Sequence, residues 1–178
     1  MRYYFLKGMD IKRLIFLAIF IVQAIILTFV EAAIPAPAGL HGLKPGLAGI
    51  FTVAALVFFS FSDTLAIILI RCVAVSLFTG GPVIFLFSVC GGVLSAVVMW
   101  IMLKTMKNIF SLTGISIAGA IAHNTGQIMV ACFVMSDLTI TAYLPVLLIS
   151  GIFTGCFIGI CSTFLVRFLK KLNLIENI

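Results

Sequence analysis

The sequence predicts an all-α integral membrane protein, a bundle of six transmembrane helices that forms one domain over residues 1–178. Of the 178 residues, 63% are hydrophobic and 9% are charged, and the mean hydropathy is +1.36. A soluble domain is about half apolar and about one-quarter charged. Because a spanning helix needs about 20 apolar residues, this length suits about six spans joined by short loops.

Apolar runs between turn residues position the helices. The expected ranges are about 14–33, 46–61, 64–79, 83–104, 114–135 and 143–169. Pro45, Pro82 and Pro145 suit the first turns of the second, fourth and sixth helices, where a missing N–H costs nothing. Asp63 is placed to cap the third helix. The second and third segments are short, which predicts tilting, shielding by neighbours or a partly re-entrant path.

The first apolar run, residues 14–30, has two interpretations. Ala36-Pro37-Ala38 resembles a signal-peptide cleavage site. However, the run is longer than the usual 7 to 15 or so apolar residues of a signal peptide, which favours a retained helix.

Basic residues gather on one predicted side of the membrane. Six spans put both termini and the turns after the second and fourth helices on the same side. That side carries Arg2, Lys7, Lys12, Arg13, Lys104, Lys107, Arg167, Lys170 and Lys171. The other side carries Lys44, in the loop of residues 32–45, while Arg71 lies inside a span. By the positive-inside rule, both termini are expected in the cytoplasm.

Several function classes are not supported by the sequence. The net charge of +6 comes from basic residues beside apolar runs rather than from aromatic-interleaved patches, so no nucleic-acid partner is expected. Five cysteines in apolar runs and two histidines favour buried packing over a metal site, and no cofactor is expected. Nucleotide loops, nucleophile elbows and aspartate clusters for Mg²⁺ are missing, so the chain does not read as a self-sufficient enzyme.

Polar residues inside the spans mark a candidate site, because a charge at mid-bilayer costs at least about 2.5 kcal/mol on insertion scales. Arg71 lies midway along the third span. His123 and Gln127 are four residues apart and share a helical face, with Asn124 rotated by about 100 degrees. In the first span, Gln23 lies eight residues before Glu31, which predicts a second polar strip facing the first. The expected ligand-binding residues are Glu31, Lys44, Arg71, His123, Asn124 and Gln127.

Two interpretations of these residues remain. They satisfy one another between helices and hold the bundle together, or they line an outward-facing pocket beneath the 32–45 loop that binds a polar or anionic head group. The second is favoured, because apolar substitutes for buried charges are cheaper.

Small residues predict where helices approach closely. Ala24, Thr28 and Ala32 form a strip on the first helix. Gly151, Gly155 and Gly159 form a double G-x-x-x-G ridge on the last.

Four features of the chain are shared with a known family: Glu31 followed by prolines, the string GLKPGLAGI at residues 42–50, Arg71 with FTGGP at 78–82, and AHNTGQ at 122–127. Over about residues 14–169 the chain resembles the heptaprenyl diphosphate synthase component I proteins, also called Gx transporters. That family is similar to the S components of energy-coupling factor transporters, six-helix proteins that take vitamins and similar compounds. The resemblance implies a multi-pass protein of the bacterial cytoplasmic membrane. It also implies energy-coupling transmembrane and ATPase subunits as partners, with the strip on the first helix as the docking surface.

The leading hypothesis is an S-component-like protein that binds a small amphipathic solute and helps to import it. The alternative is a non-catalytic membrane subunit in isoprenoid or quinone metabolism, as the family name suggests, or in flavin-linked electron transfer. A purely structural scaffold is the third hypothesis.

Overall fold

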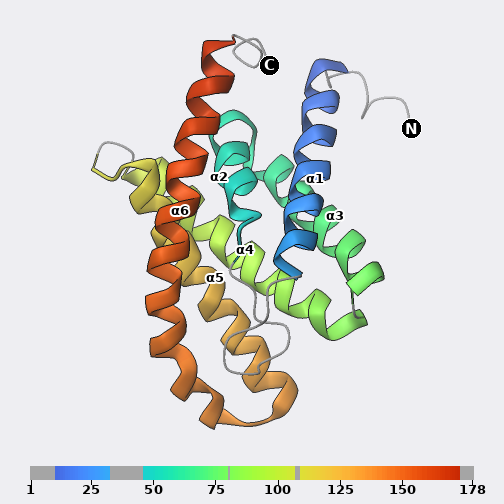
Figure 1. The fold of residues 1–178 in the computed structure, drawn as a ribbon, viewed down its shortest axis with the longest axis vertical. Coiled ribbons are helices and arrows are strands. Elements are labelled where there is room, and N and C mark those ends of the chain that lie inside the picture. Colours follow the sequence, from blue (N-terminus) through green and yellow to red (C-terminus); the bar gives the residue numbers. More distant parts are fainter. Residues whose placement is uncertain (1–10, 33–45, 80, 107–108, 173–178) are drawn as a thin grey trace.

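The computed structural model describes residues 11–32, 46–79, 81–106 and 109–172. These residues form six α-helices and one short 3₁₀ helix (Figure 1). In chain order they are α1 (Ile11–Ala32), α2 (Gly49–Phe58), α3 (Phe61–Thr79), α4 (Gly81–Thr105), α5 (Leu112–Met135), η2 (Leu138–Tyr143) and α6 (Leu144–Lys171). The prediction of an all-α fold with six helices is confirmed.

Five of the helices, all except α2, are long and apolar enough to cross a membrane. The prediction of six spans is therefore wrong for α2, which has 10 residues and a length of about 15 Å, half the thickness of a hydrocarbon core. The expected range of 46–61 was too long at both ends. Residues 46–48 form a turn, and Ser60 already caps the next helix.

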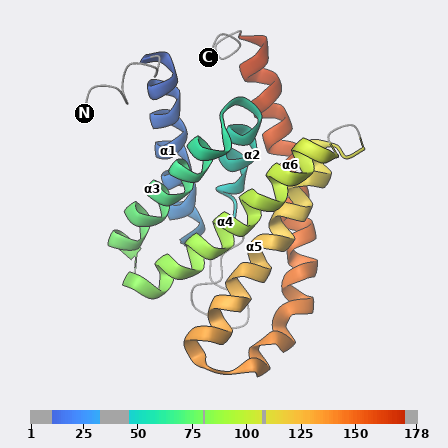
Figure 2. The same cartoon turned by 180° about the vertical axis from the view of Figure 1, so that it is seen from behind.

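Helix α2 lies at the centre of the bundle and contacts each of the other five α-helices (Figures 1 and 2). Its middle residues, Thr52 to Ala55, are all buried. The Ser162 hydroxyl of α6 donates to the Ile50 carbonyl of α2 at 3.3 Å. The middle of this short helix is therefore shielded by its neighbours, and its last residues are half-buried.

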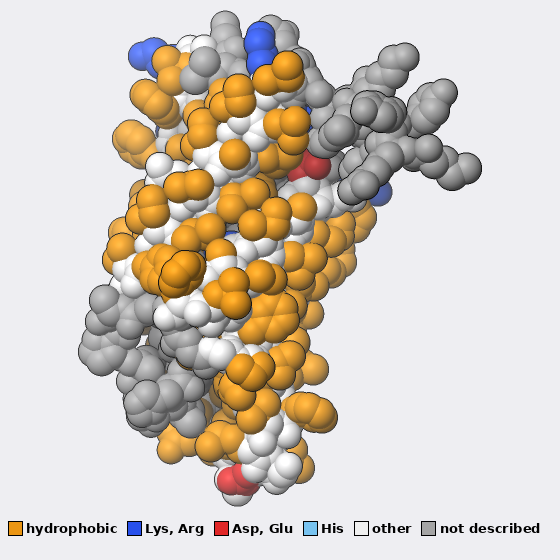
Figure 3. Space-filling model, turned by 90° about the vertical axis from the view of Figure 1, so that its right-hand side faces the viewer, with side chains coloured by type: hydrophobic (Ala, Val, Ile, Leu, Met, Phe, Trp, Pro, Cys, Tyr) orange, Lys and Arg blue, Asp and Glu red, His pale blue; other side chains and the backbone are white. Residues whose placement is uncertain are grey.

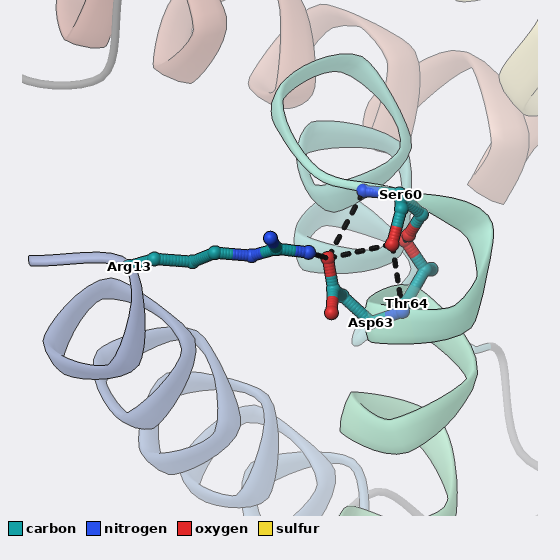
Figure 4. Close-up of polar contacts among 4 residues, drawn as sticks. All are labelled: Arg13, Ser60, Asp63 and Thr64. Atoms are coloured by element: carbon teal, nitrogen blue, oxygen red, sulfur yellow. Dashed lines mark hydrogen bonds and ion pairs between the residues drawn. The ribbon is translucent and has the colours of Figure 1, made fainter. Parts of the chain in front are cut away.

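The start of α3 is fastened to the start of α1 (Figure 4). Ser60 and Asp63 form a capping box: the Asp63 carboxylate accepts from the Ser60 amide at 3.1 Å, and the Ser60 hydroxyl accepts from the Asp63 amide at 3.4 Å. Asp63 is thus the third residue of the helix and not the N-cap that the sequence suggested. Its carboxylate also forms an ion pair with Arg13 of α1. The pair shows that α1 and α3 begin at the same end of the bundle, although α2 is too short to span.

Helices α5 and α6 are in backbone contact along the glycine ridge of α6. A Cβ on Gly155 would lie 2.6 Å from the Ile117 Cα, and one on Gly159 would lie 2.5 Å from the Thr113 Cα. Both separations are shorter than real Cβ contacts, so only glycine permits this approach.

The outer surface suits a bilayer. Large apolar side chains such as Ile19, Phe133 and Phe164 are exposed along the sides of the bundle, and hydrophobic side chains cover its flank (Figure 3). On the face shown in Figure 3, Lys and Arg side chains lie mainly in the upper part, which is the end where α1 begins and α6 ends in Figure 1. The five long apolar helices and the apolar flank make the chain a multi-pass membrane protein.

At the opposite end of the bundle, Asp137 lies in the turn between α5 and η2. Its carboxylate accepts hydrogen bonds from the hydroxyl and the amide of Thr139, and these bonds lower its pKa.

The glycine ridge predicts a steric effect on stability. Gly155→Ala is expected to lower the free energy of unfolding in detergent by about 1–3 kcal/mol, because α5 and α6 must separate. Gly49→Ala is the control, since its Cβ would lie 3.5 Å from Ile158 Cδ1, an ordinary contact. Equal thermal stability of the two variants would contradict this packing.

The charge distribution predicts the orientation. In a background with the native cysteines replaced by alanine, we expect an impermeant maleimide to label the Leu138→Cys variant on intact cells. The Lys171→Cys variant should react only after permeabilisation, because the basic end is expected in the cytoplasm. Labelling of both variants on intact cells would refute the assignment.

Candidate functional site

A small cavity lies at mid-height between α2, α3, α4 and α5, with one residue from α6. Its volume is about 20 Å³, which is room for about one water molecule. It is lined by Gly46, Gly49, Thr52, Arg71, Gly92, Ser95, Met99, Ser116, Ala120, His123 and Ile158. The cavity thus brings together Arg71 and His123, two of the predicted site residues, from helices far apart in the sequence.

Arg71 reaches the cavity because α4 has no side chain at Gly92. A Cβ there would lie 3.2 Å from Arg71 Nη2 and 2.9 Å from Ile68 Cγ2. The side chain is 6% exposed. The guanidinium therefore lies inside the bundle and not on a lipid-facing or aqueous surface.

His123 enters from α5 past the neighbouring glycine, Gly91. A Cβ on Gly91 would lie 2.9 Å from His123 Nδ1, so the ring fits beside α4 because Gly91 has no side chain. The opposite edge of the ring lies against the turn that precedes α2, where a Cβ on Gly46 would be 3.1 Å from His123 Cδ2. The adjacent glycines of α4 thus leave room for one polar side chain each. Gly92 makes room for Arg71 of α3, and Gly91 makes room for His123 of α5.

The charge in the cavity is positive and uncompensated within the described part of the chain. Arg71 carries a permanent positive charge, and it lines the cavity together with His123. None of the lining residues is a carboxylate. Among the described residues, the one ion pair with an N–O distance within 4.0 Å joins Arg13 and Asp63, far from Arg71. Arg71 donates to the Cys72 sulfur at 3.8 Å, a weak interaction with a neutral group that supplies no counter-charge.

Two of the hydroxyl groups of the cavity are engaged with backbone carbonyls four residues earlier in the chain. Ser116 donates to the Leu112 carbonyl at 2.8 Å, and Thr52 donates to the Ala48 carbonyl at 3.4 Å. Arg71 and His123 are therefore the side chains best placed to offer N–H groups to a bound molecule.

Glu31, the one acidic residue of α1, is 2% exposed and is bonded to a wall of the cavity. Its carboxylate accepts a hydrogen bond from the Leu47 amide, in the turn whose Gly46 contacts His123. The sequence placed Glu31 across from His123. In the structure its carboxylate is bonded to Leu47 instead, and the neighbouring Gly46 is the residue that contacts His123.

Asn124 points away from the cavity toward α6. Its side-chain amide donates to the Leu147 carbonyl at 2.6 Å, and Gly151 makes room for it, since a Cβ there would lie 2.9 Å from Asn124 Nδ2. The rotation of about 100 degrees between neighbouring helical residues separates Asn124 from His123. This contact ties α5 to α6.

The remaining predicted residues lie apart from the cavity lining. Gln127 is 2% exposed, and its Oε1 atom is buried without a hydrogen-bond partner among the described residues. Gln23 is exposed on α1 whereas Glu31 is buried, so the predicted polar strip of α1 is wrong. Lys44 lies outside the described residues. Ala24 and Thr28 are buried within this chain, so they pack α1 against its own bundle, and the side chain of Ala32 is not described.

Sequence reasoning missed the roles of Gly91, Gly92, Ser95 and Ser116. The adjacent glycines in the middle of an apolar helix were the available signal, because glycine in a helix interior marks a close approach. The hydroxyl residues gave no comparable signal, since single serines are common in membrane helices.

A larger hollow of about 580 Å³ lies on the outside of α4 and α5 and is lined by apolar side chains together with Cys90 and Gly126. It is separated from the polar cavity by the contact of the two helices, where a Cβ on Gly126 would lie 2.9 Å from the Cys90 carbonyl oxygen. The larger volume is therefore a lipid-facing depression, and the polar groups converge in the smaller one. Among the described residues, no group of three His, Cys, Asp or Glu side chains could hold a metal ion.

The family model of heptaprenyl diphosphate synthase component I matches residues 20–165. The chain belongs to this family. The match includes every helix except the first residues of α1 and the last of α6, and it contains the whole cavity. Neither the search of curated proteins nor the search of solved structures finds a match.

The different surroundings of two neighbouring amides predict opposite effects on stability. Asn124→Leu is expected to cost about 1–3 kcal/mol of unfolding free energy, because it removes a buried hydrogen bond to α6. Gln127→Met should be neutral or stabilising, since it removes a buried carbonyl oxygen that has no hydrogen-bond partner in the described part of the chain. Thermal unfolding in detergent measures both, and the reverse order would contradict these assignments.

Proposed function

We propose that this membrane protein binds a small amphipathic solute through an anionic group held by Arg71 and His123, and helps to bring that solute across the membrane. The observation that carries the proposal is the buried guanidinium of Arg71, which has no carboxylate within 4.0 Å among the described residues.

An unmatched charge at this depth is costly. Placing an arginine at the centre of a spanning helix costs about 2.5–3.5 kcal/mol on insertion scales. A buried charge without a partner is among the most destabilising features of a protein interior. A solute carboxylate or phosphate would supply the missing charge, and guanidinium groups bind both with paired hydrogen bonds.

A solute group of that kind is larger than the cavity of about 20 Å³, so binding requires a wall to move. The turn at residues 46–48 is the wall we expect to open. It lies at the end of α2 that leads back to α1, and a hydrogen bond to Glu31 holds it. Opening there would connect the cavity to the end opposite the basic residues, the side expected to face outward.

Transport as an S component further requires an energy-coupling partner. The buried positions of Ala24 and Thr28 argue against docking through that strip. We propose instead that the exposed apolar face of α1, with Ile15, Ile19 and Val22, meets the membrane subunit of such a partner.

The family description favours a second candidate, a non-catalytic membrane subunit that works with a prenyl diphosphate synthase. The three acidic residues of the described chain, Glu31, Asp63 and Asp137, lie at separate places in the fold. They offer no cluster for Mg²⁺, so catalysis would belong to the partner. Affinity purification from membranes separates the candidates: ATPase and coupling subunits support solute transport, whereas a prenyl synthase or a flavin-linked enzyme supports the second.

Replacing Arg71 provides the decisive test of the site. Arg71→Gln is expected to abolish retention of the native solute, measured by native mass spectrometry of protein purified gently from membranes. Its thermal stability in detergent should be unchanged or higher, because an unmatched buried charge is removed.

Arg167→Gln, at the end of α6 that we expect to face the cytoplasm, is the control and should retain the solute. A less stable Arg71→Gln protein that still carries the wild-type solute would refute the proposal and assign Arg71 to holding the bundle together.

A further inference from the structure

A second pocket lies at the basic end of the bundle, away from the cavity around Arg71. It has a volume of about 210 Å³ and is lined by Leu56 and Val57 of α2 and by Trp100, Leu103 and Lys104 of α4. None of these residues lines the central cavity. The pocket therefore stands apart from the site of the proposed function.

The pocket combines apolar walls with one cation at its edge. Trp100 is held by Phe61 of α3, with ring centroids 4.9 Å apart. Lys104 Nζ lies 5.0 Å from the centroid of the Trp100 ring. Lys104 is exposed and takes no part in the one ion pair found among the described residues. Its ammonium group is therefore available to an anion that approaches over the ring.

The depth of the pocket matches the boundary between headgroups and acyl chains. Trp100 and Lys104 lie in the last turns of α4, and tryptophan is enriched at the membrane interface. Arg13, Lys170 and Lys171 lie toward the same end of the bundle. A basic surface of this kind attracts the anionic lipids of the adjoining leaflet.

We propose that this pocket binds an anionic phospholipid. Its phosphate contacts Lys104, and the upper part of one acyl chain lies against Trp100, Leu56 and Leu103. A free anion would leave the apolar walls uncovered, and a zwitterionic lipid would gain less from Lys104. Because the pocket lies between α2 and α4, a bound lipid would contact Leu56 and Val57 and brace the short helix against α4.

Native mass spectrometry of the full chain, titrated with phosphatidylglycerol or phosphatidylcholine in detergent, tests the proposal. Wild type is expected to prefer phosphatidylglycerol by about five-fold, the effect of one lysine near an anionic headgroup. Lys104→Gln should abolish that preference. Lys171→Gln, at another exposed lysine toward the same end, should retain it.

Two further measurements distinguish binding in this pocket from a general attraction of anionic lipids to the basic surface. Trp100→Leu, checked for unchanged helix content by circular dichroism, should weaken retention of both lipids because it removes the apolar wall. Inorganic phosphate should not displace phosphatidylglycerol. The proposal fails if Lys171→Gln removes the preference as fully as Lys104→Gln does, or if free phosphate competes.

Discussion

The burial of the Arg71 charge is the constraint on which the rest of the structure depends. A guanidinium at mid-height in a membrane bundle needs space, polar neighbours and a counter-charge. The fold supplies the space through Gly92. It supplies a polar neighbour through His123, which passes the adjacent Gly91. The counter-charge is the one requirement that the described chain does not meet. This missing negative charge is the reason for expecting an anionic ligand.

The surrounding helices support that arrangement. Helix α2 fills the centre of the bundle without spanning it, and its leading turn closes the cavity against His123. Glu31 fastens that turn at one end of α1, and Arg13 fastens the start of α3 at the other. On the far side, the glycine ridge and Asn124 join α6 closely to α5. The α5–α6 side of the bundle is thus in backbone contact, whereas the turn at residues 46–48 is attached through the hydrogen bond of Leu47 to Glu31, and opening is expected at this turn.

Much of this architecture follows from the sequence alone. Apolar run lengths, prolines at helix starts and the glycine ridge are local signals, and they identified an all-α membrane protein with six helices. The short span of α2 was visible as a short apolar segment. The capping box of Ser60 and Asp63 and the turn at Gly46 set the ends of α2. These contacts cannot be read from the spacing of apolar residues along the sequence.

The candidate site was predictable in part. Arg71 and His123 stood out because polar groups in spans are costly, and the structure brings them together. Asn124 carried the same signal yet serves the contact with α6, and the helical rotation from His123 was the clue to its separate direction. Helical spacing placed Glu31 and Gln23 on one strip, yet Glu31 is buried and Gln23 is exposed. The spacing alone does not tell which neighbouring helix each residue meets, because that depends on the packing of the bundle.

The most direct test of this account is an experimental structure of the protein purified from its own membrane at a resolution that shows side chains and small ligands. The account predicts non-protein density between Arg71 and His123, with an anionic group within hydrogen-bonding distance of the guanidinium and a wider gap at residues 46–48. A closed cavity in which a carboxylate of the chain itself pairs with Arg71 would contradict it.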